Sequence, residues 1–175
     1  MSVVSAYMVP HPPMILPEIG RGEEEEIRET IDAYEIVADE IAEIKPETII
    51  ISSPHSVMYS DYFHISPGKT ASGSFSMFGA PEVRFEQGYD TELVKEIENL
   101  AFKNGIPAGT LGERDKALDH GTMIPIYFIR KKYTDFKVIR AGISGLPLTD
   151  HYALATYTTF LPSFSAASAI TLPSA

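Results

Sequence analysis

Cysteine is absent from the 175 residues of the sequence, and its absence excludes several kinds of chemistry at once. Disulfide bonds, thiolate metal sites and a cysteine nucleophile all need a thiol, so none of them is available. A chain without disulfides fits a reducing compartment, and the N-terminus lacks the charged and apolar regions of a signal peptide. We therefore expect a cytoplasmic protein.

Positive charge is scarce as well. Lys and Arg number 14 against 24 Asp and Glu, which gives a formal net charge of −10. Nucleic acids and anionic membranes both select a basic surface, so we expect neither as a partner. No apolar run reaches the roughly 20 residues that cross a bilayer. These absences favour a small-molecule ligand.

The remaining composition is that of an ordinary globular protein, with 44% hydrophobic and 22% charged residues. The length is enough for one domain with a sizeable core and too short for two. We therefore expect residues 1–175 to form a single domain.

Strand-like and helix-like segments alternate along the chain. Residues 3–9, 48–52 and 137–143 are apolar runs rich in β-branched side chains, which is typical of buried parallel strands. Residues 23–44 and 90–104 instead repeat apolar side chains at steps of three and four, the spacing of one helical face. The order predicts an α/β fold, a mostly parallel sheet with helices on both faces. Residues 72–85 interrupt this order and predict an irregular hairpin.

Three of the five histidines lie in loops beside these elements. His11 follows the first strand within "PHPP", and His55 follows the second strand after Pro54. His120 follows Asp119 at the entry to an apolar helix. The carboxyl ends of parallel strands meet at one edge of a sheet, where ligands bind in open α/β folds. We therefore expect the three imidazoles to converge on one pocket there.

Such a cluster suits metal chemistry. Two neutral imidazoles and a carboxylate hold non-haem iron and leave positions open for substrate and dioxygen. A third imidazole nearby can act as an acid or a base near neutral pH. A single histidine in a proline turn is more often structural, however, so the residues alone leave both interpretations open.

The motifs "PHPP" (10–13), "SPH" (53–55) and "LDHGT" (118–122), in this order, resemble the class III extradiol ring-cleavage dioxygenases, the LigB-like superfamily. The stretches "DYFHISPG" (61–68) and "IRAGISGLPLTDHYAL" (139–154) resemble its Memo-like branch, which travels with AmmeMemoRadiSam proteins. The resemblance extends from residue 3 to about residue 154.

The resemblance implies a three-layer α/β sandwich with His11 and His55 as metal ligands, and with His120 and its neighbour Asp119 as catalytic residues. It implies Fe(2+) as the cofactor, with Zn(2+) as an alternative, and a small catechol-type aromatic as the substrate. The alternative function is a Memo-like module that binds a metal or another ligand without cleaving a ring. Whether the chain is an enzyme stays open at this point.

The segment 152–175 is atypical because all 38 charged residues precede it. Members of the family complete the metal site with a ligand further along the chain, and use another histidine there as a base. This segment has no His, Asp or Glu side chain, so we expect the C-terminal part of the family domain to be missing or replaced after about residue 154. The segment is then either buried or an interface, which would allow a homo-oligomer, or a substitute sequence.

The two other histidines have less defined roles. His151 follows Asp150 at a predicted helix start, and we interpret it as a capping-region residue. His64 lies in a short predicted strand and either points into the pocket or packs beside Tyr62 and Phe63.

Overall fold

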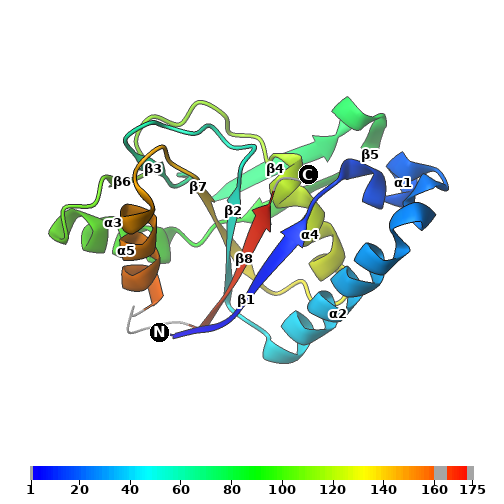
Figure 1. The fold of residues 1–175 in the computed structure, drawn as a ribbon, viewed down its shortest axis with the longest axis horizontal. Coiled ribbons are helices and arrows are strands. Elements are labelled where there is room, and N and C mark those ends of the chain that lie inside the picture. The colour runs from blue at the N-terminus through cyan, green and yellow to red at the C-terminus, as the bar shows by residue number, and fades with distance from the viewer. Residues whose placement is uncertain (1, 160–164, 173–175) are drawn as a thin grey trace.

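A four-stranded parallel sheet forms the centre of the computed structural model, which describes residues 2–159 and 165–172 (Figure 1). Its strands lie in the order β1-β8-β2-β7, and every neighbouring pair is parallel. The strands are β1 (Ser2–Pro10), β2 (Thr48–Ser53), β7 (Lys137–Gly142) and β8 (Ser165–Leu172). The parallel order brings the carboxyl ends of β1 and β2 to the same edge.

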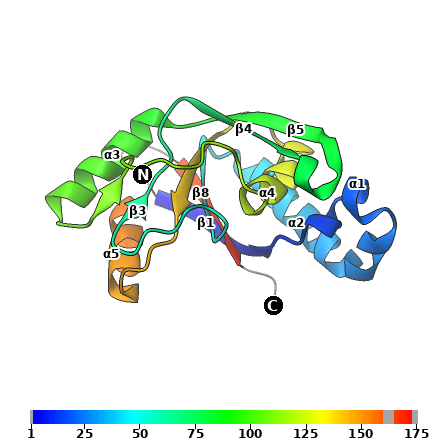
Figure 2. The same cartoon turned by 90° about the horizontal axis from the view of Figure 1, so that it is seen from above.

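Helices cover both faces of this sheet, as Figure 2 shows from above. One face carries α2 (Arg28–Ile44) and α4 (His120–Arg130), and the other carries α3 (Thr91–Lys103) and α5 (Leu148–Thr159). Alternate residues of β2 divide between the two layers: Ile49 and Ile51 join the core under α2 and α4, and Ile50 packs on the cluster under α3. The predicted three-layer α/β sandwich is confirmed.

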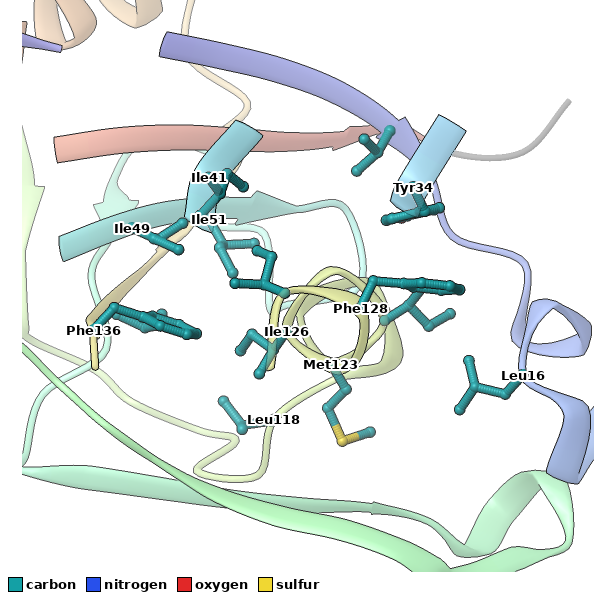
Figure 3. Packing of buried hydrophobic residues seen from close by; sticks show 14 of the residues in the cluster. Leu16, Tyr34, Ile41, Ile49, Ile51, Leu118, Met123, Ile126, Phe128 and Phe136 are labelled. Carbon is teal, nitrogen blue, oxygen red and sulfur yellow. The ribbon is translucent and has the colours of Figure 1, made fainter. Parts of the chain in front are cut away.

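The larger core surrounds α4, which is buried on nearly all sides. Figure 3 shows Met123 directed toward the hairpin strands, and Ile126 on the side of the sheet. Tyr34 of α2 stacks on Phe128, with ring centroids 4.4 Å apart. The helix therefore connects the sheet on one side to the hairpin on the other.

That hairpin consists of β4 (Thr70–Phe75) and β5 (Ala80–Gly88), joined through a 3-10 turn at Ser76–Phe78. Gly79 ends the turn at φ +80°, a conformation that favours glycine. The hairpin predicted over 72–85 is present. The short strands β3 (Phe63–His64) and β6 (Ala108–Gly109) form a separate parallel pair.

The helix predicted from residue 23 begins later than expected. Glu23–Ile27 is a 3-10 helix, and the α-helix starts at Arg28. Four consecutive glutamates repel one another, and Gly22 before them has φ +109°, so the first turns are wound differently. A further 3-10 turn (Pro13–Ile15) and α1 (Pro17–Gly20) precede it.

The uncharged segment contains the end of α5 and the whole of β8. β8 lies between β1 and β2, and Ala169 pairs with Tyr7 on one side and with Ile51 on the other. The segment therefore supplies a strand of the central sheet, with a paired neighbour on each side. Residues 160–164 and 173–175 lie outside the described part of the chain. Among the described helices, none combines the length and the apolar character needed to cross a bilayer.

Candidate metal centre

His11 is held by a rigid, buried loop. Prolines at positions 10, 12 and 13 fix the backbone on both sides of it and end β1. The hydroxyl of Tyr34 donates a hydrogen bond of 2.5 Å to the carbonyl of Pro10. The side chain of His11 is only 2% exposed, so packing as well as backbone stiffness places its ring.

His55 is positioned by a turn at the end of β2. The backbone N–H of His55 donates to Oγ of Ser53 (3.2 Å), and Oγ of Ser56 donates to the carbonyl of Ser53 (2.9 Å). The residue is exposed, in contrast to His11. Hydrogen bonds therefore fix the backbone of this loop while the imidazole stays accessible.

His120 is the first residue of α4, directly after the capping residue Asp119. Oδ1 of Asp119 accepts hydrogen bonds from the N–H of Thr122 (3.0 Å) and from Oγ of Ser53 (2.6 Å). Oδ2 accepts one from Oγ1 of Thr122 (2.9 Å). The carboxylate thus caps the helix and ties its start to the end of β2.

The three imidazoles meet at the carboxyl edge of the sheet, as the sequence predicted. One ligand nitrogen from each of His11, His55 and His120 lies within 4.8 Å of the others. The Nε2 atoms of His11 and His55 are 2.8 Å apart. The rings of His55 and His120 are tilted by 38° with centroids 3.9 Å apart. Within the described residues, this is the group of side chains that could hold a metal ion.

The short contact between two Nε2 atoms fits a shared cation. Two nitrogens bound to one ion at about 2.0–2.1 Å and at right angles would lie about 2.8–3.0 Å apart. Without an ion, one ring must carry a proton on Nε2 and donate it to the other. The observed separation of 2.8 Å suits both states, and the donor set suits the metals that prefer imidazole.

The environment keeps the rings of His11 and His120 neutral. Burial, together with the charges that His55 and His120 would carry, lowers the pKa of His11 to about 4. Burial, followed by the charge on His55, also lowers the pKa of His120. At neutral pH both rings therefore have a lone pair available for a metal ion or a proton.

An open groove of about 890 Å³ adjoins His55 and His120. The hairpin supplies one wall with Met77, Arg84 and Phe85, and the ring of Phe78 meets His120 edge to face at 5.2 Å. The sequence indicated the hairpin but not this contribution, because the docking of the hairpin over α4 depends on long-range packing. The groove is large enough for a small aromatic molecule.

The remaining predicted residues lie apart from the cluster. His64 is buried in β3 and lines a separate small cavity rather than the groove. His151 is in the first turn of α5, as expected, with Nδ1 3.1 Å from the carbonyl of Pro147. Asp119 does not belong to the ligand cluster, and its catalytic role stays a prediction.

Comparison with known proteins finds a matching family model and a curated relative. A family model described as the catalytic LigB subunit of aromatic ring-opening dioxygenase matches residues 5–156. Protein CA_C1420 from Clostridium acetobutylicum is 39% identical over 154 residues, which are 83% of this chain and 33% of that protein. The chain therefore spans about a third of the length of this curated relative.

Proposed function

The chain belongs to the LigB family of aromatic ring-opening dioxygenase subunits, and from this premise we propose that it is an extradiol dioxygenase-like domain that binds Fe(2+). In this proposal His11 and His55 are metal ligands, and His120 is the acid–base residue beside them. The substrate is a small catechol-type aromatic.

The observation that carries the proposal is the 2.8 Å approach of two Nε2 atoms from the ends of two parallel strands, with a third imidazole beside them. Bound there, Fe(2+) would supply Lewis acidity toward the two hydroxyls of a catechol and the one-electron chemistry that dioxygen requires. Both atoms of dioxygen enter the product when the ring bond next to the diol breaks, so no separate reductant is needed.

The side chains of this site have distinct tasks in such a reaction. The groove beside His55 and His120 offers an apolar wall, including Phe85 and Met123, against which an aromatic ring can lie. The lowered pKa of His120 leaves it neutral, so it can accept a proton from a catechol hydroxyl. Asp119 fixes the start of the helix that presents His120.

Oxygen uptake tests this proposal. The protein is reconstituted with Fe(2+) without air, and oxygen consumption is then followed with a panel of catechols. Uptake that matches the formation of a ring-opened product, and that His11→Ala removes, would support the proposal. Stable Fe(2+) binding without uptake for any catechol would contradict the ring-cleaving activity.

A second candidate function is a Memo-like metal-binding module without ring cleavage. The favouring observation is that the ligand cluster among the described residues consists of three imidazoles and no carboxylate. Three histidines with one open position are also a familiar zinc site. Metal analysis of the purified protein, together with the oxygen measurement, separates the two candidates. A Memo-like module should retain Zn(2+) and show no oxygen uptake.

A cytoplasmic location and a homo-oligomer stay predictions. Light scattering of the purified chain measures its mass in solution, and fractionation of the source cells locates the protein. A monomer at all concentrations would contradict the predicted self-association.

A further inference from the structure

A second, much smaller cavity lies behind the metal centre. Its volume is about 10 Å³, and its walls come from residues 56–57, from residues 114–115 and Asp119, and from His64 and Arg140. This space corresponds to about one water-sized sphere, near the lower limit for a buried water molecule. Asp119 lines both this cavity and the large groove, so the two spaces share a wall.

His64 presents an unpaired polar atom in this region. Its side chain is 7% exposed, and Nε2 has no hydrogen-bond partner among the described residues. β3 is held against the end of β7, because Ile65 bridges Ala141 and the N–H of Ser66 donates to the carbonyl of Arg140 (2.9 Å). A buried nitrogen in so fixed a position normally has a partner, and ordered water is the usual one.

Arg140 offers the donor that such a water needs. The residue is 3% exposed, and three of its five N–H groups have acceptors. Nε donates to Oγ of Ser66 (2.6 Å), Nη2 donates to the carbonyl of Asp115 (2.6 Å), and Nη1 donates to the carbonyl of Ala117. Glu113 lies further away, with Oε1 at 3.9 Å from Nη2. One N–H on each Nη atom is therefore left for another acceptor.

Asp119 offers a matching acceptor. Oδ1 already accepts two hydrogen bonds, from Ser53 and from the N–H of Thr122, whereas Oδ2 accepts only one, from Oγ1 of Thr122. A carboxylate oxygen accepts about two hydrogen bonds, so Oδ2 has capacity for one more.

We propose that the cavity holds one ordered water molecule, which accepts a hydrogen bond from Arg140 and donates to Nε2 of His64 and to the carboxylate of Asp119. His64 and Arg140 are then positioning residues for the loop that carries Asp119 and His120 to the metal centre. Burial lowers the pKa of His64, which keeps the ring neutral at neutral pH, and in the tautomer with the proton on Nδ1 the Nε2 atom is an acceptor. Arg140 also holds the same loop directly, because it donates hydrogen bonds to the carbonyls of Asp115 and Ala117.

A crystal structure of the wild-type protein, at a resolution that shows ordered water, tests the water site directly. The expected result is a water peak about 2.7–3.2 Å from Nε2 of His64 and within the same range of Arg140. A dry cavity, or a ring turned so that Nε2 bonds a protein atom, overturns the proposal. This measurement does not depend on the proposed function.

Variants of His64 test the positioning role, which rests on metal binding at the histidine cluster. His64→Leu keeps the bulk and removes the acceptor, whereas His64→Gln keeps a polar acceptor. The matched control is His151→Leu, since His151 contacts the ring of Phe63 and does not line the cavity. Co(2+) affinity and the visible absorption band of the bound Co(2+) are the measurements, with circular dichroism as the check of folding.

We expect His64→Leu to weaken Co(2+) binding about 10-fold, at the lower end of the usual effect of an outer-shell partner, and to shift the absorption band. His64→Gln should restore most of the affinity, and His151→Leu should equal the wild type. Equal losses in Leu and Gln variants, or no loss in either, overturn the positioning role. If the wild type binds no Co(2+), the proposed function fails and the water peak alone decides this inference.

Discussion

Two aspartates cap two helices in nearly the same way at opposite ends of β2. Asp90 caps α3 by accepting from the N–H of Leu93 (3.0 Å) and from Oγ1 of Thr48 (2.6 Å), the first residue of β2. Asp119 caps α4 and accepts from Oγ of Ser53 (2.6 Å), the last residue of the same strand. Each cap ties the start of a helix to one end of β2.

The main difference between the two caps is in the residues that surround them. Each aspartate lines an open groove, but three imidazoles lie beside Asp119, whereas Asp90 does not belong to the metal-ligand cluster. Each aspartate therefore has a structural role as a helix cap. Only the cap at the carboxyl edge of the sheet lies beside residues that could bind a metal ion. Matched substitutions at the two ends of β2 can separate the contribution of Asp119 to stability from its contribution to metal binding.

The largest contrast is expected from the metal ligands themselves. His11→Ala and His55→Ala should each reduce metal retention by more than about 100-fold, because each removes a ligand rather than an outer-shell partner. Asp90→Ala, at the other end of β2, should leave retention unchanged. Elemental analysis of the purified variants measures this. We expect His120→Ala to keep most of the metal, and an equal loss in all three histidine variants would make His120 a ligand.

Removing either cap should lower the stability of the protein by a similar amount, whereas only the loss of Asp119 should weaken metal binding. Asp119→Ala and Asp90→Ala should each lower the free energy of unfolding by about 1–2 kcal/mol, the usual cost of a lost cap. Asp119→Ala alone should also weaken metal binding by about 10–100-fold, because His120 and the Ser53 contact lose their support. Urea unfolding and Co(2+) titration measure the two effects. A similar loss of affinity in Asp90→Ala would show that general destabilisation, not position, is responsible.

Acid should lower the stability of the metal-free protein through the buried ring of His11. The pKa of His11 falls from 6.5 to about 4 on folding, mainly because the ring is buried. Between these values the unfolded chain binds a proton that the folded chain does not, so the stabilisation present above pH 6.5 is lost as the pH falls toward 4. Unfolding curves across this range should show the decline, and His11→Gln should reduce it. His151→Gln is the control and should keep the wild-type slope.

The smallest effects are expected from the two hydroxyls of β2. Ser53→Ala and Thr48→Val each remove one hydrogen bond to a capping aspartate, which is worth about 0.5–1.5 kcal/mol. Thermal unfolding should show comparable losses for both variants. Co(2+) affinity should fall only in Ser53→Ala. A fall in Thr48→Val would contradict the prediction that only the Ser53 end of β2 supports metal binding.

Local patterns in the sequence were enough to predict the parts of this site that depend on neighbouring residues. The proline turns at His11 and His55 predicted where two strands end, and the apolar spacing of residues 90–104 predicted the helix that Asp90 caps. Two predicted strands, each followed by a histidine, were therefore enough to predict that His11 and His55 lie at the carboxyl edge of the sheet.

Features that depend on distant partners were not predictable in the same way. The position of β8 between β1 and β2 is a matter of which strands pair, and its Ala and Ser residues have little intrinsic preference for a strand. The groove wall that Met77 and Phe85 supply follows from the docking of the hairpin on α4, which no local pattern specifies. The small cavity beside His64 likewise joins segments that are far apart in the sequence.

The place of β8 has a consequence for the order in which the molecule assembles. β1 and β2 are synthesised first, but β8 separates them in the finished sheet, at about 4.8 Å per strand spacing. The correct distance between the His11 and His55 loops therefore exists only after residues 165–172 have entered the sheet. Pairing over so long a stretch of chain is slow, and the edges of β1 and β2 are exposed until then. During synthesis the chain thus carries His11, His55 and His120 before it contains the strand that sets the spacing of the first two.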